Sequence, residues 1–439
     1  MSMSETDTDP QHFTRAVAEL GEVRPVLTHC AIFNSQGIKI IEQGVAVNLG
    51  LYERLMQHRL SAPIEDSVSS EGAVTGAILR GSAEAALASV PFYGRMAQDN
   101  ATRNLLLDTI EKLALPAPMA FQLTLAREVR PEVYFNSVRA ALTAAWLARA
   151  PLVSRYDIGM AAAAGLLHDV GMLHIDPTLL QPARALDRSQ RRQLYSHPLI
   201  STALLQRQHV YPKEVIRAVG EHHEFLNGSG YPRNLVGDAI SPLGRILALT
   251  ELVTAIFASG REAPELRLSV VLRLNLHRYD PGLCSRVLGL LQPEPDPGAD
   301  PGVLLADPVQ RLLDLNQLLS DWPAALRQDP GLSAERQHGL DMLARQVSEL
   351  HRALAASGAE ARQLAYLGSE PLDAHLKFEL SLLAGEAAWQ LRALARQSRR
   401  RWRLEADASY PAPLAEWLER TDALVAPIAE ADQPGQAVQ

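Results

Sequence analysis

The sequence predicts a mainly α-helical protein. Of its 439 residues, 47% are hydrophobic but only 5% are aromatic, and alanine and leucine are prominent in the apolar segments. Side chains of this kind are typical of helices that pack against other helices. Proline punctuates long segments in which apolar residues recur every three or four positions, which also favours helices. At roughly 150 residues per domain, the length suggests two or three domains.

The N-terminal part of the chain predicts a small strand-and-helix unit. Its first residues are polar and acidic and are expected to be disordered, and FTRAVAEL then reads as a short helix. Two apolar runs, at 26–33 and 37–41, flank the turn Asn34–Gly37, so they predict a β-hairpin. Helical spacing returns at 51–60, and the stretch 71–115 has the composition of connecting helices.

The central part predicts one helical domain that carries every chemical motif. Its expected helices are 140–150, 158–171, 189–208, 212–224 and 243–258. The segment QPEPDPGADPG behind it predicts a linker, and the long Leu/Ala/Arg/Gln segments beyond it predict a helical bundle or a coiled-coil-like region. The expected segments are 1–12 (disordered), 13–115 (strand-and-helix unit with connecting helices), 116–291 (central domain), 292–302 (linker) and 303–439 (helical C-terminal region).

Composition restricts the classes of partner. The net charge of −8 disfavours binding to a nucleic-acid polymer. The polar N-terminus does not resemble a signal peptide, and no apolar run approaches the roughly 20 residues that cross a bilayer. We therefore expect a cytoplasmic protein that does not bind membranes. Cys30 and Cys284 lie far apart in the sequence, which argues against a disulfide framework or a zinc knuckle.

Two histidine motifs indicate a metal site. His168 and Asp169 end the apolar segment AAAAGLL, and the sequence His222-His223-Glu224 follows further along the chain. Imidazole and carboxylate groups are ligands of first-row metals, and burying them at the end of an apolar helix is costly unless they are paired or metal-bound. A simple His-Asp hydrogen bond is the structural alternative. On a helix, His222 and His223 would point about 100° apart, which would hinder binding of one ion by both.

A glycine-rich loop follows the second motif. It reads NGSGYP at 227–232, and its glycines permit positive φ and close backbone approach, while Pro232 restricts the exit. A well-formed surface loop is the structural alternative to a ligand-binding role. With LLHDVGMLHI at 166–175, YSHPLI around His197 and HHEFLNGSGYP at 222–232, the central segment resembles the HD-GYP family of bacterial metal-dependent phosphodiesterases acting on cyclic di-GMP.

The resemblance implies an HD-type all-helical domain and assigns roles to residues. It places His168 and Asp169 at the catalytic centre. The implied metal ligands are His168, Asp169, His197, His222, His223 and Glu251. The residues implied to contact the ligand are Gly230, Tyr231, Pro232, Arg233, Arg245 and Arg261. Each arginine would otherwise be an ordinary salt-bridging surface residue. The resemblance also implies iron or manganese as the metal.

Three positions depart from the family pattern. Asn136 stands where the family has a histidine, Glu251 where it has an aspartate, and Met172 where it has the lysine of His-Asp-x-Gly-Lys. A carboxamide is a poorer ligand than imidazole, glutamate is longer by one methylene, and methionine removes a phosphate-binding cation. We therefore expect one tightly held iron or manganese ion, with any second ion bound weakly.

Two functions of different classes follow from the resemblance. The first is a divergent phosphodiesterase that hydrolyses cyclic di-GMP to a linear dinucleotide or GMP. The second is a catalytically degenerate module that binds metal or nucleotide and acts on a GGDEF-type cyclase or another signalling protein through its GYP loop. A degenerate HDOD-like scaffold is disfavoured by the HHE and GSGYP sequences. Homo-oligomerisation stays open, and the surviving ligand positions favour hydrolysis.

Overall fold

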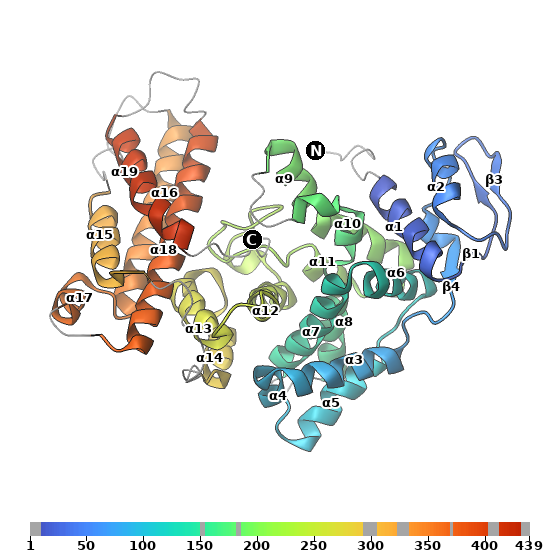
Figure 1. Ribbon diagram of the computed structural model, residues 1–439, viewed down its shortest axis with the longest axis horizontal. Coiled ribbons are helices and arrows are strands. Elements are labelled where there is room, and N and C mark those ends of the chain that lie inside the picture. Colours follow the sequence, from blue (N-terminus) through green and yellow to red (C-terminus); the bar gives the residue numbers. More distant parts are fainter. Residues whose placement is uncertain are drawn as a thin grey trace. The chain divides into compact units, whose positions relative to one another are not determined.

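The computed structural model describes residues 10–149, 154–180, 186–292, 305–322, 333–368, 372–402 and 412–431. The described chain is mainly helical, as the sequence predicts (Figure 1). It forms two compact units. Within the described residues, one unit takes in the chain up to Ala258 together with Arg278–Arg286, and the other takes in Ser259–His277 and the positions from Val287 onward. No described helix is both long and apolar enough to cross a membrane.

The first unit begins with short strands and helices. Its elements are α1 (Pro10–Val23), β1 (Val26–Thr28), β2 (Ile32–Phe33), β3 (Lys39–Ile41), α2 (Leu49–Met56), η1 (Ile64–Asp66) and β4 (Val68–Ser70). Strand β1 pairs antiparallel with β4, and β2 pairs antiparallel with β3. The expected hairpin is therefore present only between β2 and β3, where Gly37 takes a φ of +77° in the turn. The first apolar run is divided between two sheets because β1 pairs with a strand much further along the chain.

Helix α1 corrects the expected N-terminal boundary. It starts at Pro10, so the end of the segment 1–12, expected to be disordered, is helical, while residues 1–9 lie outside the described chain. Phe13 of α1 stacks on His174 with ring centroids 4.3 Å apart and an interplanar angle of 5°. Arg207 forms a 2.6 Å ion pair with Glu65 of η1. These contacts join the strand-and-helix elements to the central helices within one unit.

Helices form the rest of the first unit. They are α3 (Gly76–Ser89), α4 (Pro91–Met96), α5 (Asn100–Glu111), α6 (Ala117–Val129), α7 (Pro131–Ala148), α8 (Arg155–Leu167), η2 (Val170–His174), η3 (Pro177–Leu180), α9 (Arg188–Leu194), α10 (His197–Gln208), α11 (Lys213–Val219), η4 (Gly237–Ala239) and α12 (Pro242–Ala258). Helix α7 lies along α8 and also packs against α12 (Figure 1). The close approach requires Gly165, because a Cβ there would lie 2.5 Å from the carbonyl oxygen of Ala140.

Three of the expected central helices are shorter or divided. The helix expected at 158–171 ends at Leu167, so the His-Asp pair follows it. The helix expected at 189–208 is broken at Tyr195 and Ser196 into α9 and α10. Pro198 accounts for this break, because proline is favoured in the first turn of a helix and restricts the residue before it. The helix expected at 212–224 ends at Val219, and the HHE sequence lies in the turn beyond it.

The second unit is a bundle of long helices, as expected for the C-terminal region. Its helices are α13 (Pro264–Leu274), α15 (Pro308–Ser320), α16 (Ala334–Ala356), α17 (Ala361–Leu367), α18 (Ala374–Trp402) and α19 (Ala412–Ala431). Leucine and alanine side chains form most of its core. Helix α18 packs against α13, α15, α16 and α19 (Figure 1). The short η5 (Leu276–Arg278) and α14 (Pro281–Leu290) span the division between the units. Helix α13 belongs to this bundle, and the expected linker 292–302 lies, apart from Gln292, outside the described residues.

Candidate metal centre

The His-Asp pair is held at the junction between α8 and η2. His168 caps the C-terminus of α8, and Asp169 directly precedes η2. Gly171 lets η2 lie against the first turn of α10, because a Cβ there would lie 2.3 Å from the carbonyl oxygen of His197. Its amide also donates to Ser201 Oγ at 2.9 Å. The glycine of the motif therefore brings the His-Asp pair beside His197.

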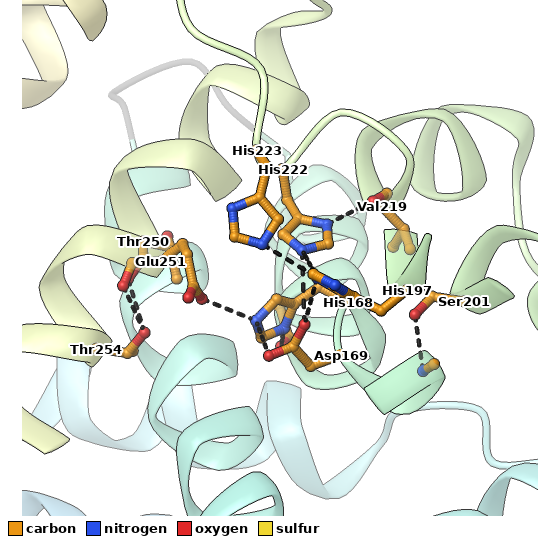
Figure 2. Close-up of polar contacts among 12 residues, drawn as sticks. His168, Asp169, His197, Ser201, Val219, His222, His223, Thr250, Glu251 and Thr254 are labelled. Carbon is orange, nitrogen blue, oxygen red and sulfur yellow. Dashed lines mark hydrogen bonds and ion pairs between the residues drawn. The ribbon is translucent and has the colours of Figure 1, made fainter. Parts of the chain in front are cut away.

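The turn after α11 brings two adjacent imidazoles into the same site. His222 and His223 have ring centroids 4.2 Å apart and an interplanar angle of 46°. The expectation that the two rings would diverge by about 100° on a helix is wrong, because the helix has already ended at Val219. In the turn, both side chains face His197 (Figure 2).

Two groups of candidate ligands share Asp169. In the first group, the ligand atoms of Asp169, His197, His222 and His223 lie within 4.8 Å of one another. The second group consists of His168, Asp169 and Glu251 (Figure 2). Asp169 Oδ1 lies 3.3 Å from His197 Nε2 and 3.5 Å from His222 Nε2, whereas Asp169 Oδ2 lies 3.4 Å from His168 Nε2. One carboxylate therefore faces both groups, and the structure brings together all six residues that the resemblance implies as metal ligands.

The orientation of the rings fits a bound cation. The Nδ1 atoms of His168, His197 and His222 lie 2.6 to 2.8 Å from the carbonyl oxygens of Gly165, Leu194 and Val219, respectively. When Nδ1 of a neutral imidazole donates to a carbonyl, Nε2 carries the lone pair. Yet the Nε2 atoms of His197 and His222 lie only 3.1 Å apart, so two lone pairs would face each other.

A metal ion bound here would resolve this conflict, because it would accept both lone pairs. Asp169 Oδ1 gives independent support, because it is buried and has no hydrogen-bond partner among the described residues. Buried polar atoms without a partner are uncommon and are often explained by an ion or a water molecule. The donor set of imidazole nitrogens and carboxylate oxygens suits iron or manganese.

The charges at the site depend on burial and on neighbouring groups. Burial lowers the pKa of His197 to about 4 despite the attraction of Asp169, which keeps this imidazole neutral at pH 7. Burial and the neighbouring His222 likewise lower the pKa of His223 well below its usual value. Burial also disfavours charge on His168, but attraction to Asp169 and Glu251 outweighs it and raises the pKa of His168 to about 9. A proton or a metal ion beside His168 Nε2 would satisfy the same two carboxylates.

Exposure of the site is uneven. The His168, His197 and His222 side chains are at most 3% exposed, whereas those of Asp169 and Glu251 are 20% and 18% exposed. Solvent therefore reaches the centre on its carboxylate side. Glu251 lies on α12, and its Oε2 is 3.1 Å from His168 Nε2.

The glycine-rich loop is fastened directly to the histidine turn. A Cβ at Gly230 would lie 2.4 Å from the carbonyl oxygen of His223, so only glycine fits without a shift. The next amide, that of Tyr231, donates to this same oxygen at 3.0 Å, and the Tyr231 ring stacks on the His223 ring with centroids 4.5 Å apart. Glu224 accepts from the amides of Arg233 and Leu235 at 2.7 and 2.8 Å. Glu224, the third residue of the HHE sequence, therefore anchors the loop. These hydrogen bonds account for its carboxylate, which does not need to be a metal ligand.

The remaining residues expected to contact a ligand belong to the loop, to α12 and to the second unit. Pro232 follows Tyr231 in the loop. The guanidinium of Arg233 lies 3.3 Å from Glu221, and that of Arg245 lies 2.7 Å from Asp238. Arg261 belongs to the second unit, where its amide contacts Ser259 Oγ at 3.4 Å.

Of the three departures from the family pattern, Glu251 belongs to the second ligand group, and the other two lie on α7 and η2. Asn136 is on α7, and no described hydrogen bond or ion pair links it to the ligand groups. Met172 is on η2, is 7% exposed, and its amide donates to the carbonyl oxygen of Asp169 at 2.9 Å.

Two other residues near the site are not indicated by the sequence. Tyr195 stacks on Tyr231, and Glu221 is a fully buried carboxylate that accepts from Ser241 and Arg217.

Fold and site together define an all-helical HD-type domain built around histidine and carboxylate ligands. Residues 128–281 match the family described as HD domain. A 3'3'-cGAMP-specific phosphodiesterase of Vibrio cholerae is 32% identical over 123 residues, which cover 28% of this chain and 26% of that protein. A cyclic di-GMP phosphodiesterase of Pseudomonas aeruginosa is 31% identical over 185 residues, which cover 41% of this chain and 44% of that protein. The chain thus spans less than half the length of either relative.

These similarities lie in the central segment, and they confirm the resemblance to the HD-GYP family that its motifs predict. A solved structure described as an HDG"Y"P protein from Bdellovibrio bacteriovorus covers 61% of this chain and 94% of that chain at 15% identity. Its TM-score of 0.32 is too low to support any conclusion about the site.

Proposed function

We propose that the chain is a metal-dependent phosphodiesterase that hydrolyses a cyclic dinucleotide. The observation that carries this proposal is the grouping of His197, His222 and His223 with Asp169, whose buried Oδ1 has no hydrogen-bond partner among the described residues. Relatives named as cyclic di-GMP and 3'3'-cGAMP phosphodiesterases support a cyclic dinucleotide as the substrate class. Cyclic di-GMP is the substrate predicted from the motifs.

The residues divide into two metal positions. His197, His222, His223 and Asp169 would hold one ion, and His168, Asp169 and Glu251 would hold a second. Bound iron or manganese would supply a lowered pKa for a coordinated water and positive charge for the transition state at phosphorus. Because Asn136 replaces a family ligand, the second position is the weaker one.

The protein's own side chains perform the orienting work. The carbonyl contacts of His168, His197 and His222 fix the tautomer and the direction of each ring. The phosphodiester would approach beside Asp169 and Glu251, since these are the partly exposed members of the cluster. Burial favours the neutral forms of His197 and His223 and limits the access of water to the ligand side of the site. Arg233, Arg245 and Arg261 stay predictions as phosphate contacts.

A second candidate function is supported by the lost residues. Asn136 and Met172 remove an imidazole and a cation that the family pattern contains, while the loop around Tyr231 is well formed. A module of this kind would bind metal or nucleotide and act through a signalling partner such as a GGDEF-type cyclase. A cytoplasmic location and homo-oligomerisation are further predictions that belong to either function.

Metal analysis and turnover of one variant pair test the proposal. The purified protein should retain iron or manganese and hydrolyse cyclic di-GMP, with 3'3'-cGAMP assayed in parallel. Asp169→Asn should abolish metal retention and hydrolysis, because it replaces the carboxylate shared by the two ligand groups with a neutral carboxamide. Glu53→Gln, an exposed acidic residue of α2, is the matched control and should change neither. Metal retention without turnover of either dinucleotide would contradict hydrolysis and support the binding module.

A further inference from the structure

His223 differs from the other clustered imidazoles in how its ring is held. The Nδ1 atoms of His168, His197 and His222 each contact a carbonyl three residues earlier. For His223, no such contact occurs among the described residues. Its ring is instead covered by Tyr231, with ring centroids 4.5 Å apart and an interplanar angle of 19°. Stacking therefore takes the orienting role that a hydrogen bond has at the other rings.

The stack continues to a third ring. Tyr195 lies on the Tyr231 ring with centroids 4.3 Å apart and an interplanar angle of 18°. The three rings, Tyr195, Tyr231 and His223, thus form an aromatic stack whose inner member presents Nε2 to His197 at 3.1 Å. Parallel aromatic rings at this separation attract each other and exclude water from the shared faces.

Tyr195 is placed by the same turn that delivers a metal-ligand candidate. It caps α9 through its amide, which donates to the carbonyl oxygen of Arg191 at 2.8 Å. Ser196 Oγ donates to the carbonyl oxygen of Gln193 at 2.6 Å, and His197 follows as the first residue of α10. The turn therefore fixes the outer end of the stack relative to the ligand group.

We propose that Tyr195 is a positioning residue of the metal centre, acting through Tyr231 on the ring of His223. The inference rests on the metal site of the proposed function but does not require catalysis. The stack limits rotation of the His223 ring and covers its outer face. Without Tyr195, one face of Tyr231 loses its neighbour, and the His223 nitrogen is held less firmly in its ligating direction.

The test is the affinity of the full chain for Mn²⁺, measured by competition with a fluorescent chelator. Changing residues that orient a metal ligand commonly weakens binding by about 10- to 100-fold. Because Tyr195 acts through a second ring, we expect Tyr195→Ala to weaken Mn²⁺ binding by roughly tenfold, at the low end of that range. Tyr195→Leu, which keeps apolar bulk without an aromatic face, should do the same, and Tyr195→Phe should restore wild-type affinity.

Two further variants separate positioning from a general loss of structure. Tyr156→Ala removes a tyrosine of α8 that is 65% exposed and should leave Mn²⁺ affinity unchanged. In a His223→Ala background, Tyr195→Ala should add little further loss, because its effect passes through the missing imidazole. Wild-type affinity in Tyr195→Ala, an undiminished effect of Tyr195→Ala in the His223→Ala background, or no Mn²⁺ binding by the wild type would each overturn the inference. Mn²⁺ binding without dinucleotide turnover would overturn only the proposed hydrolysis.

Discussion

The Nε2 atoms of His197 and His222 lie 3.1 Å apart, although Nδ1 of each ring contacts a backbone carbonyl. In neutral rings of this tautomer, neither Nε2 can donate to the other. The pair is therefore arranged for an external acceptor of lone pairs. This relationship gives the metal centre a basis in geometry that does not depend on sequence similarity.

Metal content should reflect the unequal quality of the two ligand groups. The group of His197, His222, His223 and Asp169 has four candidate ligands, whereas the group containing Glu251 lacks the family histidine at position 136. We expect close to one tightly held iron or manganese ion per chain after dialysis. Elemental analysis checks this, and two tightly bound ions, or none, would show the assignment to be wrong.

Acid should destabilise the protein through His174. Burial, with a smaller contribution from Arg207, lowers the pKa of His174 from 6.5 to about 3. Below about pH 6.5 the unfolded chain protonates His174, whereas the folded chain keeps this imidazole neutral. The free energy of unfolding is therefore highest above pH 6.5 and decreases as the pH falls toward 3. Between pH 7 and pH 5 the loss amounts to about 2 kcal/mol.

The variant His174→Phe should remove this dependence while keeping a ring beside Phe13. Urea unfolding at pH 7 and pH 5 should show a smaller decrease in the free energy of unfolding for His174→Phe than for the wild type. The same substitution at the exposed His58 should leave the decrease unchanged. Equal pH dependence in His174→Phe and wild type would contradict the assignment of this proton to His174.

A methyl group at Gly230 should disturb the loop and the metal centre together. The new Cβ would lie 2.4 Å from the carbonyl oxygen of His223 and 2.5 Å from Glu224 Cα, so the backbone must move. Overpacking of this kind costs about 1–3 kcal/mol, and displacement of Tyr231 should also weaken metal retention. Gly159→Ala on α8, where a Cβ meets no atom within 4 Å, should not weaken either. Thermal unfolding and metal analysis of both variants provide the comparison.

Restoring the family pattern should raise turnover if the protein is a weakened hydrolase. The triple variant Asn136→His, Met172→Lys and Glu251→Asp rebuilds the second metal position and returns a phosphate-binding cation. Turnover of cyclic di-GMP should increase by about tenfold or more, since one transition-state contact alone can be worth about 10²-fold. Met172 is buried, so thermal unfolding must accompany the assay to exclude a loss of folded protein. A folded triple variant that holds two ions yet shows no turnover would favour the binding module.

The sequence predicts the helical class and the ligand set because both depend on local patterns. Apolar spacing predicts helices at α8 and α12. The HD and HHE motifs predict candidate ligands, and the structure places their histidines and Asp169 close together. The ends of the helices are harder to predict from the sequence. The break at Tyr195 is signalled only by Pro198, and the turn at His222 interrupts a segment that otherwise has helical composition.

Contacts between distant segments could not be predicted from one sequence. The stack of Tyr195 on Tyr231 joins side chains 36 positions apart, and the stack of Phe13 on His174 joins the N-terminal helix to η2. Such pairs depend on how helices pack, which periodicity alone does not specify. The assignment of α13 to the C-terminal bundle has the same origin, because its buried leucines pack on α18.

The four residues Glu221 to Glu224 form a turn in which carboxylates and imidazoles have separate duties. Glu221 accepts from Ser241, and Glu224 accepts from two loop amides, while His222 and His223 between them face the ligand group. Fixing a residue outside regular secondary structure costs conformational entropy of about 1–2 kcal/mol. Here the hydrogen bonds of Glu221 and Glu224 offset that cost when the chain folds. A metal ion that bound here would therefore meet two imidazoles that are already ordered, and its affinity would not be lowered by the cost of ordering them.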